Sequence, residues 1–159
     1  MGVAADLTGK LRGEAYVGVT EREFDAASLG DITEPTFGGN LLYRPTALTS
    51  IQVGLNRDIQ ETTLSNASGF VQTVVNGRIE HAVRKNVLLG AEAAIGQNDY
   101  EGGTSNREDD TLQLGLDARY DFNRNVAASV GYEYVERDSN EANSSFTSNR
   151  FMTRLLGKF

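Results

Sequence analysis

The chain has 159 residues, a formal net charge of −7 and no cysteine. The length suits a single domain spanning residues 1–159, the negative charge argues against nucleic acid as a partner, and the lack of cysteine excludes disulfides and thiolate metal sites. No apolar run approaches the ~20 residues that a membrane-spanning helix needs, so any crossing of a membrane must use strands.

Eight segments alternate apolar and polar residues with a period of two, which predicts strands with one apolar and one polar face. The pattern is clearest where Leu112, Leu114 and Leu116 alternate with Gln113 and Asp117. In chain order the predicted strands lie at about residues 11–19, 37–44, 51–56, 71–80, 89–96, 112–122, 128–134 and 150–159.

The connections between these strands alternate in length. Short turns are expected at 44–47, 84–86 and 123–125, and long polar loops at about 25–35, 60–68, 99–110 and 137–148. This alternation is typical of an up-and-down meander, with short turns at one end and longer loops at the other, as in outer-membrane barrels. The sequence therefore predicts an all-β fold: an eight-stranded antiparallel up-and-down transmembrane β-barrel. The strand Leu11–Val19 is expected to pair with Phe151–Phe159 and close it.

The last predicted strand carries an apolar face that runs to the final residue of the sequence. Phe151, Leu155 and Phe159 lie on this face and alternate with cationic residues. This pattern resembles the C-terminal signal that the bacterial barrel-insertion machinery reads, and it predicts that machinery as a partner during biogenesis. An edge strand of a soluble sandwich is the alternative interpretation of the same segment.

The polar positions of the strands carry charges of both signs. An eight-stranded barrel has an interior that side chains can fill, and opposite charges buried there are expected to pair. The predicted interior network consists of Arg12, Glu14, Arg78, Glu80, Glu92, Asp117, Arg119, Glu133 and Arg154. The alternative is a narrow polar channel whose charges select solutes.

Catalytic and metal-binding patterns are weak. His81 is the only histidine, so a two-histidine metal site is not possible. The topology places His81 at the short-turn end, away from Ser65, Ser68 and Ser144, so a serine–histidine–aspartate arrangement is not expected either. No enzyme activity, metal or cofactor is predicted. The run Glu108–Asp109–Asp110 lacks the spacing and central glycine of a calcium loop. Loose binding of divalent cations among lipopolysaccharide phosphates is the alternative for that run.

Four stretches carry a resemblance to a known family: "DLTGKLRGEAYVGVTEREFD", "LLYRPTALTSIQVGLNRDIQETTLSNASGF", "NDYEGGTSNREDDTLQLGLDARYDFNRNVAASVGYEYVERDSN" and "FTSNRFMTRLLGKF". Together they resemble the putative β-barrel porin type-two family of outer-membrane proteins, over about Asp6 to Phe159. The resemblance implies an outer-membrane location. Members of this family are typically longer, so it also implies that the chain corresponds to the C-terminal part of a larger barrel. It supplies no catalytic residues.

Three functions remain open on the sequence. The first is a monomeric bacterial outer-membrane barrel with a structural or narrow-pore role, in contact with membrane lipid and lipopolysaccharide. The second is a C-terminal module of a larger porin or polysaccharide-export barrel. The third is a soluble lipocalin-like carrier, which needs its apolar face inside. Charges and glycines on the strands favour the two membrane hypotheses.

Overall fold

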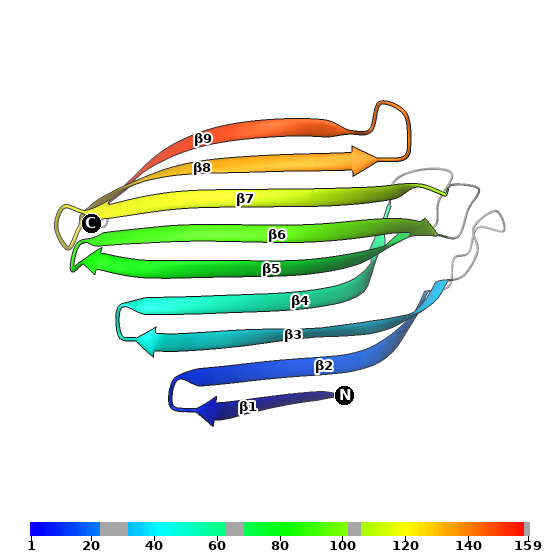
Figure 1. Ribbon diagram of the computed structural model, residues 1–159, viewed down its shortest axis with the longest axis horizontal. Coiled ribbons are helices and arrows are strands. Elements are labelled where there is room, and N and C mark those ends of the chain that lie inside the picture. The colour runs from blue at the N-terminus through cyan, green and yellow to red at the C-terminus, as the bar shows by residue number, and fades with distance from the viewer. Residues whose placement is uncertain (23–31, 63–68, 102–105, 158–159) are drawn as a thin grey trace.

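The computed structural model describes residues 1–22, 32–62, 69–101 and 106–157, which form a single antiparallel sheet (Figure 1). Its nine strands follow one another in chain order across the sheet, so each strand pairs with its sequence neighbours. Among the described residues, no helix is long and apolar enough to cross a membrane. The predicted all-β, antiparallel, up-and-down topology is confirmed.

The strands are 7 to 16 residues long. They are β1 (Gly2–Thr8), β2 (Leu11–Arg22), β3 (Ile32–Thr46), β4 (Thr49–Glu61), β5 (Gly69–Arg84), β6 (Val87–Glu101), β7 (Glu108–Asp121), β8 (Val126–Ser139) and β9 (Phe146–Gly157). Short turns link β1 to β2, β3 to β4, β5 to β6 and β7 to β8, so the predicted alternation of short and long connections is correct. Most strands extend further into the long connections than the apolar alternation predicts.

The predicted number of eight strands is wrong, because β1 precedes the first predicted strand. Val3, Ala5 and Leu7 alternate with polar or small residues over only seven positions, a length below the ~9–11 residues of a membrane-crossing strand. The segment nevertheless pairs with β2 from Gly2 opposite Tyr16 to Thr8 opposite Leu11. A short strand of this kind is held by its neighbour and not by an apolar pattern of its own.

The expected closure of the sheet is also wrong. The β2 strand pairs with β1 on one side and β3 on the other, so it does not meet β9. Within the described residues β9 pairs only with β8, which leaves β1 and β9 as two open edges on opposite sides of the sheet (Figure 1). Because neighbouring strands alternate in direction and the sheet has nine of them, β1 and β9 run the same way.

The pairing register gathers apolar side chains on one face, here called the apolar face. One row across it runs through Ile51, Ile79, Ala91, Leu116, Tyr132 and Phe151. Large side chains on this face are open to solvent: Leu116 is 61% exposed, Val130 56% and Leu155 75%. Only Ile32, Ile59, Val71 and Ala127 among the described apolar residues are buried. The sheet therefore has no apolar core of its own.

Candidate functional site

The opposite face of the sheet, here called the polar face, is the candidate functional site. The register places all the residues of the predicted interior network on this face. Arg78 lies opposite Glu92, Glu92 opposite Gly115, and Gly115 opposite Glu133, so one row crosses four strands. These residues therefore share one face of the sheet, and the side-chain contacts decide which of them interact.

Arg78 on β5 is the centre of a cluster of four charged side chains on this face. Its Nη1 donates to Glu92 Oε2 at 2.8 Å, and its Nη2 donates to Asp117 Oδ1 at 2.8 Å and to Glu80 Oε1 at 3.1 Å. The four side chains are 30–39% exposed. One guanidinium thus holds three carboxylates from three adjacent strands, and the cluster carries a formal excess of negative charge.

Two glycines make room for this Arg78 cluster. Gly90 on β6 lies opposite both Glu80 and Asp117, and a Cβ there would stand 2.8 Å from Arg78 Nη2. Gly115 on β7 lies opposite Glu92, and a Cβ there would stand 2.6 Å from Glu92 Cγ. Arg78 and Glu92 therefore lie over bare backbone on neighbouring strands, which is where a glycine permits close approach.

The other predicted network residues lie apart from the Arg78 cluster. Arg12 faces Asp6 with Nε–Oδ1 3.6 Å, and both side chains are more than 70% exposed. Arg119 pairs with Asp121 at 2.8 Å. Glu14 accepts a hydrogen bond from Asn40 at 3.0 Å, Glu133 lies 3.6 Å from Arg150, and Arg154 on the edge strand makes no ion pair with the described residues. The expected single network is therefore several separate pairs and one true cluster.

An uncharged patch on β2 to β5 was not predicted. The Tyr16 ring lies over Gly38, where a Cβ would come within 2.7 Å of it, and the Tyr16 hydroxyl donates to Asn56 Oδ1 on β4. On the neighbouring strand β4, Asn40 and Asn76 flank Gly54, and a Cβ there would come within 3.0 Å of the side-chain oxygen of Asn40. The available signal for this patch was the presence of glycines at polar positions of the strands. A side chain on a neighbouring strand can extend over the backbone at each such glycine.

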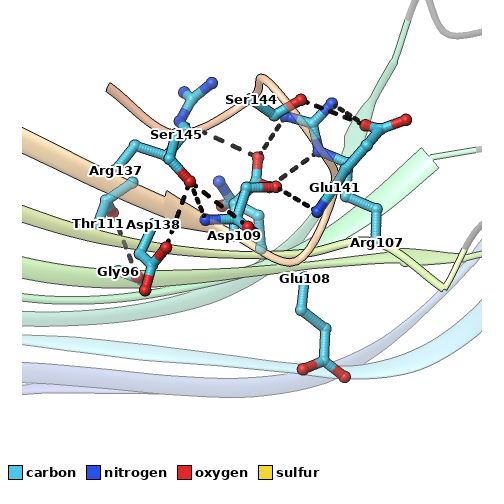
Figure 2. A network of polar contacts seen from close by, with 12 residues as sticks. Gly96, Arg107, Glu108, Asp109, Thr111, Arg137, Asp138, Glu141, Ser144 and Ser145 are labelled. Carbon is cyan, nitrogen blue, oxygen red and sulfur yellow. Dashed lines mark hydrogen bonds and ion pairs between the residues drawn. The ribbon is translucent and has the colours of Figure 1, made fainter. Parts of the chain in front are cut away.

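A second ion-pair cluster lies at the loop end of the sheet and centres on Asp109, whose side chain is fully buried (Figure 2). Arg107 binds it in a bidentate manner, with Nε–Oδ1 2.8 Å and Nη2–Oδ2 2.7 Å. The Ser139 hydroxyl donates to Asp109 Oδ1 at 2.5 Å, and Arg137 Nε stands 4.0 Å from Oδ2. Arg107 also binds Glu141 at 2.8 Å. The cluster ties the start of β7 to the β8–β9 connection.

The electrostatics of this loop-end cluster favour its charged forms. Burial alone would raise the pKa of Asp109, but hydrogen bonds from Arg107 and Ser139 outweigh burial and hold that pKa below its ordinary value. The hydrogen bonds that Arg107 itself donates to Asp109 raise the pKa of Arg107. Arg107 also lies over the Tyr100 ring, 4.8 Å from its centroid, and burial raises the pKa of that phenol. Asp109 lies three positions before Leu112 on β7, so it has the parity of the polar face.

The sequence interpretation of Glu108–Asp109–Asp110 as a continuous acidic run misses this cluster. Glu108 and Asp110 are exposed, and Glu108 points away from the cluster (Figure 2). Asp109 alone points to the arginines, because alternate residues of a strand face opposite sides. The signal for it was the placement of Arg107 two residues before Asp109, on the same side of the chain. Among the described residues no group of three or more His, Cys, Asp and Glu side chains is arranged to hold a metal ion.

The model of a family described as "Putative beta-barrel porin 2" matches residues 1–159. The chain belongs to this family. The resemblance seen in the sequence is therefore confirmed, and the all-β meander is the fold expected of a porin-type barrel. None of the curated proteins compared with the chain matches it.

Two further predicted features lie on the apolar face of this porin-family chain. Phe151 and Leu155 are 81% and 75% exposed on β9, and Phe151 stacks on Tyr132 with ring centroids 4.8 Å apart. Phe159, the third residue of the predicted insertion signal, lies outside the described residues. His81 also has the parity of the apolar face, and its Nδ1 makes a hydrogen bond with Thr49 Oγ1 at 2.9 Å.

Proposed function

We propose that the chain forms the wall of a β-barrel in the bacterial outer membrane, with its apolar face against lipid and its polar face toward the interior. The observation that carries this proposal is the division of the sheet into two chemically different faces. The apolar face exposes Leu116, Val130 and Leu155, and exposed apolar patches of this extent mark contact with lipid or a partner. Membership of a porin family favours lipid.

The polar face supports a structural or narrow-pore role. In a closed barrel the Arg78 cluster would project into the interior from three adjacent strands. Gly90 and Gly115 let these side chains pack closely against the wall, which would fix a group of charges at one level of the lumen. Charged side chains at a constriction set which ions pass. Membership of a porin family argues against the lipocalin-like carrier, which would need the apolar face inside.

A module of a larger barrel is the second candidate, and the open edges of the sheet favour it. Both β1 and β9 present unpaired main-chain groups along one side. Such groups are not tolerated against lipid and must be paired by other strands. Because β1 and β9 run in the same direction, a direct joint between them would be parallel, whereas an additional strand between them would pair antiparallel with both.

The proposed partners are membrane lipid, lipopolysaccharide at the loop end, and the barrel-insertion machinery during biogenesis. A monomeric state, a single domain and the absence of enzymatic activity stay predictions. No cofactor is invoked, since the proposed role needs binding to lipid and a polar passage only.

The experiment is refolding of the full chain from urea into lipid vesicles. We expect a heat-modifiable band on gels run without boiling, and small or blocked conductance steps in planar bilayers. Purification as a stable soluble monomer without detergent would contradict the membrane barrel and favour the carrier. Large, stable conductance steps would retain the barrel but contradict the narrow interior and favour the larger ring.

A further inference from the structure

The two ends of the sheet carry exposed charges of opposite sign. At the loop end the exposed charged side chains include Glu21, Glu101, Glu108 and Asp110. At the other end an exposed cation lies in each short connection or within three residues of it. These turn-end cations are Lys10, Arg44, Arg84, Lys85 and Arg124.

The cations at the two ends also differ in whether they are neutralised. At the loop end, Arg57 binds Glu34 at 3.0 Å and Arg107 binds Asp109 at 2.7 Å. At the turn end, Lys10 donates to a main-chain carbonyl, that of Pro45, and the remaining four cations make no ion pair with the described residues. Asp121 lies at the same end, but Arg119 neutralises it at 2.8 Å. The turn-end charge is therefore uncompensated within the part of the chain that the structure describes.

Aromatic residues place these cations at a definite depth. Tyr43 immediately precedes Arg44, and the exposed, edge-to-face pair of Tyr120 and Phe122, with centroids 4.9 Å apart, precedes Arg124. Aromatic side chains at the ends of membrane strands lie at the level of the lipid headgroups. Lysine and arginine then extend their charges outward from that level on long apolar stems. Arg44 and Arg124 are thus placed within reach of the layer that holds lipid phosphates, and Lys10, Arg84 and Lys85 lie at the same end of the sheet.

We propose that the turn-end cations form a binding surface for anionic phospholipid headgroups in the leaflet at that end of the barrel. The inference rests on the proposed membrane function. Charge complementarity selects lipids of net negative charge. The cations are spread over successive turns at one end of the strands and do not converge on a pocket. This spacing suits a row of neighbouring headgroups and not one small soluble anion.

The test uses the lack of cysteine, which permits one labelled position at a time. The full chain carrying Asn86→Cys with a fluorescent donor at the turn end, or Ala142→Cys at the loop end, is refolded into phosphatidylcholine vesicles with a minor fraction of phosphatidylglycerol. Energy transfer to headgroup-labelled phosphatidylglycerol is compared with transfer to headgroup-labelled phosphatidylcholine. We expect about twofold or greater preference for the anionic lipid at Asn86→Cys and none at Ala142→Cys, with the preference screened at ~0.5 M salt.

Two matched variants each remove three positive charges, one at the turn end and the other on the polar face. Arg84→Gln, Lys85→Gln and Arg124→Gln together should abolish the preference, whereas Arg12→Gln, Arg150→Gln and Arg154→Gln on the polar face should leave it intact. Equal transfer to the two lipids in the folded, unsubstituted protein would overturn the inference, and that comparison needs no basic-residue variant. Failure to fold even in pure phosphatidylcholine vesicles would instead contradict the proposed membrane function.

Discussion

Arg78 on β5 reaches past β6 to Asp117 on β7, and their Nη2 and Oδ1 atoms are 2.8 Å apart. The strand between them presents Gly90 at the crossing, so no side chain separates the two groups. The ion pair therefore depends on a residue that takes no part in it. A glycine in the middle of a strand is otherwise unfavourable, and this close approach gives Gly90 a structural reason.

The Gly90→Ala substitution should destabilise the folded state by about 1–3 kcal/mol, because its methyl group would occupy the space of Arg78 Nη2. Gly131→Ala is the matched control. It lies on the same face of β8, and the nearest atom to its Cβ would be Leu116 O at 3.6 Å, an ordinary contact. Urea unfolding in lipid vesicles measures both variants, and equal losses would contradict the role assigned to Gly90.

Removal of the Arg78 charge should leave three carboxylates on adjacent strands without their common partner. We expect Arg78→Gln to cost about 1–2 kcal/mol of unfolding free energy, a modest value because the side chains are part-exposed. Combining Asp117→Asn with Arg78→Gln should recover part of the unfolding free energy that Arg78→Gln alone loses. A double-mutant cycle gives the coupling, and strictly additive losses would show that the pair does not interact in lipid.

The parity of β7 predicts unequal effects for neighbouring substitutions. Leu114 lies on the apolar face. Gln113 lies on the polar face, where it is paired with Ala94 on β6 and Val135 on β8. Leu114→Arg should cost ~2–4 kcal/mol near the middle of the membrane. Gln113→Arg should cost clearly less. The same unfolding measurement compares them, and similar costs would mean that the two faces do not meet different solvents.

The loop-end cluster predicts a pH-dependent order of the β8–β9 connection. Because the pKa of Asp109 is lowered in the folded state, its stabilising contribution is fully present above the ordinary aspartate value of about 3.9. That contribution is lost as the pH falls through the lowered folded value. Hydrogen exchange of the amides of Glu108 and Asn140 should accelerate over that acidic range and stay slow near neutral pH.

Asp109→Asn should produce the same loss at neutral pH, by about 2–4 kcal/mol of local stability, because it leaves Arg107 without its bidentate partner. Asp110→Asn is the control, because the Asp110 carboxylate adjoins Asp109 in the sequence but is exposed on the other side of the strand. Equal amide exchange rates in the two variants would contradict the central role of Asp109 in the loop-end cluster.

Strands could be predicted from the sequence where the alternation of apolar and polar residues is continuous. From Leu112 to Asp121 the alternation gives both the strand and the face of each residue correctly. The strand Gly2–Thr8 was missed, because its apolar positions are few and pairing with β2 stabilises it. Closure could not be predicted, since it depends on the number of strands, and one additional short strand separates β2 from the edge.

The candidate site was predictable in its parity and not in its contacts. Alternation placed Arg78, Glu92 and Asp117 on one face, but which charges meet depends on the register between strands. The register brought Glu80 and Asp117 to opposite sides of Gly90, and it left Arg154 on an open edge. The partners of Asp109 come from the residue before β7 and from β8, segments that the sequence pattern assigned to loops.

The most direct test of the account is the side of the sheet that meets lipid. Single cysteines at Leu114, Val130, Gln113 and Ser129, labelled with a small fluorophore in refolded vesicles, report contact with quenchers attached to the lipid tails. The account predicts strong quenching at Leu114 and Val130, and weak quenching at Gln113 and Ser129, which lie on the polar face. The reverse pattern, or equal quenching at all four positions, would contradict it.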